Sequence, residues 1–257
     1  MASLRDQLKE KYGKSHLSYS SLKHALGDMR KFDAYMRGEI KYTSDALWFG
    51  NLYDSLLLTP EKAANDYVVI DDDVLSKGIK AINVKNTKEY KSRFTEFQKE
   101  AEEAGKMVVT SELWQQAHDM IARLADEGLL DAVLSSGQAQ VEFNEDIDGV
   151  PLKGFIDYLH PDYVLDSKSS RAVGKFKYDV NSFCYDIQAY IYTQVTGKQD
   201  FKWLVQEKAA PYYPALVTCT EKTLMVGEMK YDEAVANIKE WLSTEESEQQ
   251  GYGKFEV

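Results

Sequence analysis

The amino-acid sequence predicts a mixed α/β protein whose first part is mainly helical. In the first half of the 257-residue chain, apolar residues recur mostly at helical spacing, and strand-like alternation begins near residue 138. A helical segment then separates two further strand patterns. This order of elements is typical of a mixed sheet flanked by helices. We therefore expect one domain over residues 1–257, with a mainly helical part at 1–135 and a sheet-containing core at 136–257.

Capping residues, prolines and apolar spacing define the elements expected in the first part. Hydroxyl side chains within 17–22 can cap a helix that runs towards Gly38, and Thr43 or Ser44 can cap a second helix that ends at Leu58, before Pro60. The remaining elements are a short strand at 67–70 and helices at 86–104 and 111–127.

Alternation and turn residues define the elements of the second part. Asn144–Asp146 and Asp148–Gly149 supply turn chemistry after the first strand. The expected strands cover 138–143, 152–159, 163–165, 201–206 and 213–217, and the expected helices cover 183–196 and 221–242.

Composition excludes several classes of protein. The chain has 31 basic and 42 acidic residues, a net charge of -11, which argues against a protein that coats DNA through phosphate neutralisation. An enzyme that grips DNA in one local basic groove remains compatible with this balance. Two cysteines cannot form a four-cysteine zinc or iron–sulfur site. No apolar run approaches the ~20 residues of a membrane span, and no targeting signal is visible, so we expect a cytoplasmic protein without membrane contact.

The pattern with the most chemical information lies at the ends of two neighbouring strands. Asp157 closes one apolar strand, and Asp166 and Lys168 flank Ser167 at the end of the next. Residues two apart on a strand share a face, so Asp166 and Lys168 should project together, and a tight turn after Leu159 would bring Asp157 beside them. Two carboxylates can bind a divalent cation, and the amine can orient an attacking water. The alternative interpretation is a surface Asp–Lys ion pair at a hairpin.

This pattern resembles the PD-(D/E)xK nuclease superfamily, in which Gly-x-x-Asp on one strand precedes Asp-x-Lys on the next. Gly154–Asp157 and Asp166–Lys168 carry the resemblance, and Gln188–Tyr192 looks like the Gln-x-x-x-Tyr motif of the RecB-like branch. Leu17–Leu22 and Phe201–Tyr212 are similar to segments of phage and RecE-like exonucleases. The resemblance implies a restriction-endonuclease-like fold, a mixed central sheet flanked by helices with a helical N-terminal part.

The resemblance also implies roles for individual residues. The residues with implied catalytic roles are Asp157, Asp166, Lys168, Gln188 and Tyr192. The implied metal ligands are Asp157, Asp166 and the Ser167 carbonyl, with Asp54 and, more weakly, Glu142. Asp54 stands at the position where the group has the metal-ligand histidine of a Gly-x-x-x-His motif on a helix. The alternative for Asp54 is a solvent-facing position on its helix, and the alternative for Glu142 is a solvated strand face. Arg171, Lys175 and Lys177 are candidates to hold DNA phosphates, or belong to a solvated loop.

We therefore expect a metal-dependent DNA exonuclease of the phage recombination type, with one or two Mg²⁺ or Mn²⁺ ions. The resemblance implies DNA, a single-strand annealing protein and a ring-shaped homo-oligomer as partners. A structure-specific endonuclease or nickase with the same site, and a non-catalytic DNA- or protein-binding module, are the alternatives. Four tyrosines could stack on bases or belong to the core: Tyr53, Tyr185, Tyr190 and Tyr213.

Overall fold

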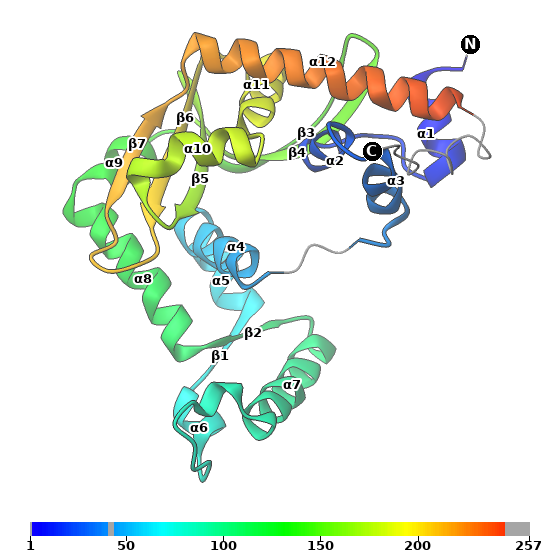
Figure 1. Cartoon of the computed structure of the whole chain (residues 1–257). Helices are drawn as coiled ribbons and strands as arrows, with labels where there is room; N and C mark the ends of the chain where they lie inside the picture. Colours follow the sequence, from blue (N-terminus) through cyan, green and yellow to red (C-terminus); the bar gives the residue numbers. More distant parts are fainter. Residues whose placement is uncertain (1, 41–43, 245–257) are drawn as a thin grey trace, which may run out of the picture.

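A five-stranded mixed sheet is the centre of the computed structural model, which describes residues 2–40 and 44–244 (Figure 1). The strands lie side by side in the order β3–β4–β5–β6–β7. All neighbours are antiparallel except β5 and β6, which are parallel. Their bounds are β3 (Gln138–Ile147), β4 (Val150–Leu159), β5 (Tyr163–Ser170), β6 (Asp200–Glu207) and β7 (Pro214–Thr218). The predicted mixed sheet is confirmed.

Helices from both parts of the chain pack against one face of this sheet. Because β5 and β6 are parallel, they need a crossover, and α10 (Phe176–Ser182) and α11 (Tyr185–Thr196) provide it after the short 3₁₀ turn η2 (Val173–Lys175). The long helix α12 (Glu221–Ser243) lies over α11. The N-terminal helices complete this layer: α1 (Leu4–Tyr12), α2 (Tyr19–Ala25) and α3 (Met29–Arg37).

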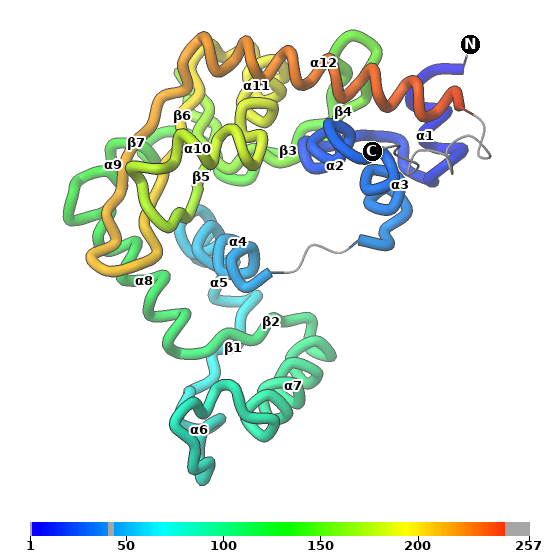
Figure 2. The backbone as a smooth tube through the Cα atoms, viewed as in Figure 1, coloured from blue at the N-terminus to red at the C-terminus, as the bar shows by residue number. Residues whose placement is uncertain are grey.

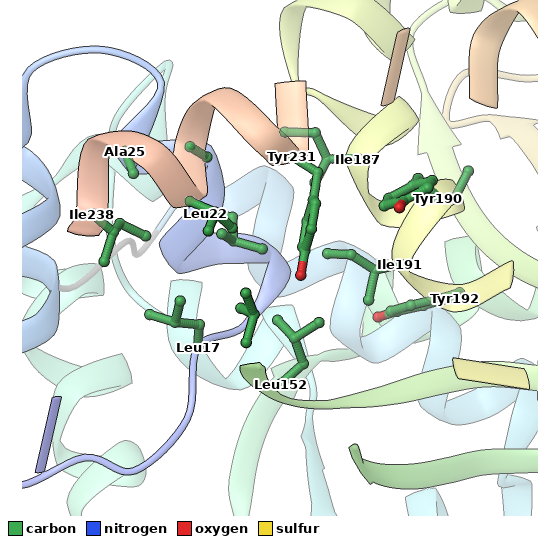
Figure 3. Close-up of a cluster of buried hydrophobic side chains, with 14 of the residues drawn as sticks. Leu17, Leu22, Ala25, Leu152, Ile187, Tyr190, Ile191, Tyr192, Tyr231 and Ile238 are labelled. Atoms are coloured by element: carbon green, nitrogen blue, oxygen red, sulfur yellow. The ribbon is translucent and has the colours of Figure 1, made fainter. Parts of the chain in front are cut away.

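The core of this layer joins residues far apart in the sequence. Figure 3 shows Tyr231 of α12 among Leu22 of α2, Ile191 of α11 and Leu152 of β4, all of which belong to one buried cluster. Burial of such apolar side chains is the main favourable contribution to folding. The N-terminal helices are therefore part of the same core as the sheet.

A second helical layer covers the other side of the sheet. It consists of α4 (Asp45–Leu58), α5 (Pro60–Asp66), α8 (Ser111–Asp126) and α9 (Leu129–Val133). Ser44 caps α4 by accepting a hydrogen bond from the Leu47 N–H, as the sequence predicts. Leu52 of α4 and Met120 of α8 are fully buried in a cluster that includes Leu204 of β6.

A small lobe with its own core extends beyond α4 and α8 (Figure 2). Its two strands, β1 (Tyr67–Ile70) and β2 (Met107–Thr110), pair in parallel. Between them lie α6 (Asp72–Ser76), the 3₁₀ turn η1 (Val84–Asn86) and α7 (Lys88–Glu103). The sequence analysis identified β1 but not β2, which runs directly into the helix pattern of α8.

Two further expectations differ from the structure. The helix expected to run towards Gly38 is divided into α2 and α3, because Asp28 caps a new helix by accepting a hydrogen bond from the Arg30 N–H. Asn144–Asp146 belongs to β3, and the turn falls at Asp148 and Gly149, both with positive φ. Among the helices of the described ranges, none combines the length and apolar character needed to cross a bilayer.

The closest approach between α11 and α12 occurs at Gly227. A β-carbon built there would lie 2.2 Å from the backbone oxygen of Asp186 and 3.1 Å from the Tyr190 β-carbon. We expect Gly227→Ala to lower the free energy of unfolding by about 1–3 kcal/mol or more, since backbone atoms must move. Gly27→Ala is the control, because a β-carbon there meets nothing within 4 Å. Urea unfolding of both variants measures the difference, and equal stabilities would contradict the close packing.

Candidate active site

The ladder between β4 and β5 ends where the two acidic residues of the motif meet. The strands pair at Tyr158–Leu165 and Leu159–Val164, so Asp157 and Asp166 occupy the next opposed positions. There the Asp157 carboxylate accepts a hydrogen bond from the Ser167 N–H, with 2.9 Å between Oδ2 and N. A side chain thus satisfies a backbone donor, and the two carboxylates lie together as the strand spacing predicts.

Asp166 is contacted on both of its carboxylate oxygens. Its side chain has no exposed surface, and Oδ2 forms an ion pair with the Lys168 ammonium. Its Oδ1 accepts a hydrogen bond from Gln188 Nε2 at 2.7 Å. Asp166 and Lys168 share a strand face because they are two residues apart, and Gln188 reaches them from α11.

Helix α11 contributes three polar or aromatic groups to the site. Gln188 and Tyr192 are four residues apart, and their Nε2 and hydroxyl groups are 3.3 Å apart. The Tyr192 hydroxyl also donates to the Phe155 carbonyl of β4, at 2.8 Å. The Lys168 ammonium lies over the Tyr185 ring, 4.9 Å from its centroid. These contacts fix the helix against the end of the β4–β5 ladder.

Asp54 approaches the same place from α4. Its Oδ1 atom is buried and accepts no hydrogen bond from any residue that the structure describes. Burial raises the pKa of Asp54 well above its usual range, and the neighbouring Asp157 carboxylate raises it further. The Ser167 hydroxyl and the Lys168 ammonium oppose these effects on the pKa only in part.

The other two charged residues of the cluster are also strongly perturbed. Burial raises the pKa of Asp166; the Lys168 ammonium opposes this rise, and the Asp157 carboxylate adds to it. Burial alone would lower the pKa of Lys168, but the Asp166 and Asp157 carboxylates outweigh it and hold that pKa above its usual value. Three carboxyl groups therefore lie near one ammonium, and a bound cation would favour their charged forms.

A buried polar network holds α4 against the sheet beside this cluster. Tyr53, the residue before Asp54, donates from its hydroxyl to Gln206 Oε1 at 2.5 Å. Gln206 Nε2 donates to the carbonyls of Met120 and Tyr212, at 2.7 and 3.0 Å. Because all of these polar groups are satisfied, the network can fix the position of α4 without leaving an orphaned donor.

The remaining residues of the sequence analysis lie outside the cluster. Glu142 is 51% exposed and forms an ion pair with Lys153 on β4, at 2.7 Å. Arg171, Lys175 and Lys177 are exposed on the segment that follows β5, and the described part of the chain shows no ion pair between them and the carboxylates.

The four tyrosines considered for base stacking have different environments. Tyr53 and Tyr190 are buried in the core, so their rings are not available to a base. Tyr213 is exposed beside Arg123, whose guanidinium is 5.7 Å from the ring centroid. Tyr185 alone of the four contacts the cluster, through Lys168.

Two residues of α2 near the cluster were missed by the sequence analysis. The Tyr19 hydroxyl donates to the Phe183 carbonyl, just before α11. The Lys23 ammonium lies 5.4 Å from the centroid of the Tyr19 ring. The only signal was the segment Leu17–Leu22, whose resemblance to the opening of an exonuclease group implied no role for either residue.

The donors present fit a divalent cation of the Mg²⁺ type. Within residues 2–40 and 44–244, no three Asp, Glu, His or Cys side chains are gathered tightly enough to form a complete metal site. The contacts explain this, because Asp166 is turned to Lys168 and Asp157 to the Ser167 N–H. The buried and unpartnered Oδ1 of Asp54 nevertheless leaves acceptor capacity, and carboxylate oxygens are the ligands that Mg²⁺ and Mn²⁺ prefer.

The fold and the motif together define a PD-(D/E)xK type domain, and comparison with protein families agrees. A family described as PDDEXK-like domain of unknown function (DUF3799) matches residues 18–256. The chain belongs to this family, and the expected superfamily is confirmed. No curated protein matches the chain.

Solved structures include one with the same overall fold. A candidate exonuclease from Eubacterium rectale is 18% identical, with a TM-score of 0.62 over 96% of this chain and 85% of that chain. An alkaline exonuclease from Laribacter hongkongensis is 12% identical, with a TM-score of 0.34 over 72% of this chain and 94% of that one. A phage-related exonuclease from Haemophilus somnus is 11% identical, with a TM-score of 0.33 over 66% and 92%. Only the first likeness is close enough to support the fold.

The unpartnered Oδ1 atom of Asp54 makes a test of the cluster possible without any activity assay. We expect Asp54→Asn to stabilise the metal-free protein by about 1–2 kcal/mol, because an amide avoids the free-energy cost of either charging or protonating this carboxyl group beside Asp157. Urea unfolding in the presence of a chelator measures this gain.

Asp45→Asn is the matched control, since Asp45 is exposed in the first turn of the same helix. It should be neutral or slightly destabilising through the helix dipole. A loss of stability in Asp54→Asn that exceeds the control would contradict the proposed charge repulsion.

Proposed function

We propose that this chain is a metal-dependent deoxyribonuclease that removes nucleotides from DNA ends. The observation that carries the proposal is the cluster of Asp54, Asp157 and Asp166 near Lys168, in which Asp166 is fully buried and the Asp54 Oδ1 atom is withdrawn from solvent. Membership of a PDDEXK-like family and the fold shared with a candidate exonuclease support it. A structural ion pair would not need two further carboxylates beside it or an amide that holds Asp166 in place.

In this proposal Asp54, Asp157 and Asp166 hold one or two Mg²⁺ or Mn²⁺ ions, with the Ser167 carbonyl as a further ligand. When bound, such an ion stabilises the negative charge that develops on the phosphate and on the leaving oxygen. The excess of carboxylates over ammonium groups in the cluster is the feature of this chain that favours cation binding.

Lys168 has the task of orienting the attacking water. Its ammonium has three donors, and the contact with Asp166 leaves others available for water or phosphate. Gln188 holds the Asp166 carboxylate, and Tyr192 holds Gln188 near β4, so the ammonium is fixed by a chain of contacts. Water oxygen forms the new bond to phosphorus and the P–O3′ bond breaks. One product ends in a 5′-phosphate, and the other ends in a 3′-hydroxyl whose oxygen takes up the proton that water loses.

The charge of the chain favours action at DNA ends. At a net charge of -11 it has little general attraction for duplex DNA, so a local group of cations must guide the strand. We propose that the exposed Arg171, Lys175 and Lys177 do so from the segment that follows β5. In this proposal these cations line a narrow channel that a DNA strand can enter only from its end. Such entry favours exonuclease over endonuclease action.

The wider role that the resemblance implies is DNA processing in phage-type recombination. A single-strand annealing protein and a ring of identical subunits are the proposed partners, and the cytoplasm is the proposed location. The likeness of the motifs to phage and RecE-like exonucleases supports this part of the proposal.

Linear and covalently closed DNA distinguish the possible activities. With Mg²⁺ or Mn²⁺ and without ATP, we expect the protein to degrade linear DNA and to leave closed circles intact, and we expect EDTA to abolish degradation. Gel electrophoresis of both substrates measures the outcome. Rapid cutting of closed circles would favour an endonuclease, and no cutting of either substrate would favour a binding module.

Lys168→Ala separates catalysis from binding. We expect at least about a 100-fold loss of cleavage rate, because the water is no longer oriented, while DNA affinity is largely kept. Asp166→Asn should in addition lose Mn²⁺ binding, measured by calorimetry.

Lys239→Ala is the control for Lys168→Ala, since Lys239 is exposed on α12. Activity of Lys168→Ala equal to that of this control would reject the proposed role of Lys168.

A further inference from the structure

A partly buried ammonium without a carboxylate partner lies beside the candidate active site. Lys23 of α2 forms no ion pair and no side-chain hydrogen bond in the part of the chain that the structure describes, and its ammonium lies over the Tyr19 ring. Burial lowers the pKa of Lys23 and the Lys168 ammonium lowers it further, whereas Cys184 opposes this lowering. Withdrawing a charge from water without a partner is unfavourable, so an arriving anion would stabilise this side chain.

An aromatic row connects Lys23 with Lys168. The Tyr19 hydroxyl donates to the Phe183 carbonyl, and the Phe183 and Tyr185 ring centroids are 5.6 Å apart. Tyr185 in turn lies beneath the Lys168 ammonium. The two cations are therefore linked through the Tyr19 ring, the Phe183 backbone carbonyl, and the Phe183 and Tyr185 rings.

Phe183 differs from the other rings of the row because half of it faces solvent. Its exposed fraction is 49%, although it precedes a helix whose next residues are largely buried. Cys184, the next residue, has a positive φ of 58°, which is uncommon for a side chain other than glycine. Backbone held in this way is often found at functional sites.

We propose that Lys23 and Phe183 form a holding site for the DNA strand beside the catalytic cluster. The Lys23 ammonium pairs with a backbone phosphate, and the Phe183 ring stacks on a neighbouring base. The ligand of this holding site is DNA, and in that respect alone the proposal rests on the proposed function. A cation and an accessible ring that are linked through Tyr19 fit the repeating phosphate and base of a strand, and such sites bind without sequence preference.

Binding without cleavage tests the proposal directly. The probe is a short fluorescein-labelled single strand with Ca²⁺ in place of Mg²⁺, measured by anisotropy over a range of salt concentrations. We expect Lys23→Gln to weaken binding about tenfold at low salt and to reduce the slope of log affinity against log salt by about 0.7, the value for one lost phosphate contact.

Lys222→Gln is the matched control, because it removes the same charge from an exposed position at the start of α12. It should leave the salt slope unchanged. If log affinity falls with log salt as steeply for Lys23→Gln as for the control, the phosphate contact is overturned. A wild-type protein that binds no DNA would also overturn it.

Variants of Phe183 test the stacking half. We expect Phe183→Leu to weaken binding about fivefold or more, and Phe183→Tyr to retain it, because only the second keeps a ring. Equal DNA affinities of the Phe183→Leu and Phe183→Tyr variants would overturn the proposed stacking. Thermal unfolding confirms that each variant is folded. Since no step requires cleavage, a wild-type protein that binds DNA in this manner but cuts none would reject the nuclease and leave the holding site supported.

Discussion

The ion pair between Asp166 and Lys168 joins a carboxylate with no exposed surface to an ammonium that is still 18% exposed. Breaking a buried pair by removing one partner is strongly unfavourable, because the other charge is left without compensation. Every element of the site is arranged around this pair: β5 carries both groups, α11 holds the carboxylate through Gln188, and β4 places Asp157 beside it. The cluster therefore exists only when the sheet and its crossover helix are assembled together.

The two helical layers have different tasks in that assembly. The layer of α11 and α12 fixes the amide and the rings that contact the pair, and it is closely packed where α12 passes over the start of α11. The layer of α4 brings Asp54 from the opposite side, and the buried network of Tyr53 and Gln206 sets its position. Packing on each face thus determines how closely the carboxylates approach one another.

Local sequence was sufficient for the parts of the site that depend on short-range geometry. Asp166 and Lys168 follow from strand periodicity, and Asp157 follows from a turn only a few residues long. Glu142 was harder, because its ion pair with Lys153 depends on the register of β3 and β4. Its proposed metal ligation stays untested.

Other parts depend on contacts between distant segments, which periodicity does not reveal. Tyr19, whose ring lies under the Lys23 ammonium, meets Phe183 only when α2 docks beside α11. Gln206 has the pattern of an ordinary strand residue until α4 and α8 surround it. The general architecture was predictable because helix caps and alternation are local signals, whereas β2 runs directly into the helix pattern of α8.

The small lobe has a separate core, and the chain enters it at Tyr67 and leaves it at Thr110, both on one short two-stranded ladder. Tyr67 and Thr110 are at opposite ends of this parallel ladder, and Lys85 of the lobe also forms an ion pair with Glu112 at the start of α8. Insertions or deletions in the mostly exposed segment 77–83, which follows α6, would change the lobe while keeping the ladder and this ion pair in place. In evolutionary terms the lobe is a place where relatives can diverge in length and surface chemistry while the carboxylate cluster stays as it is.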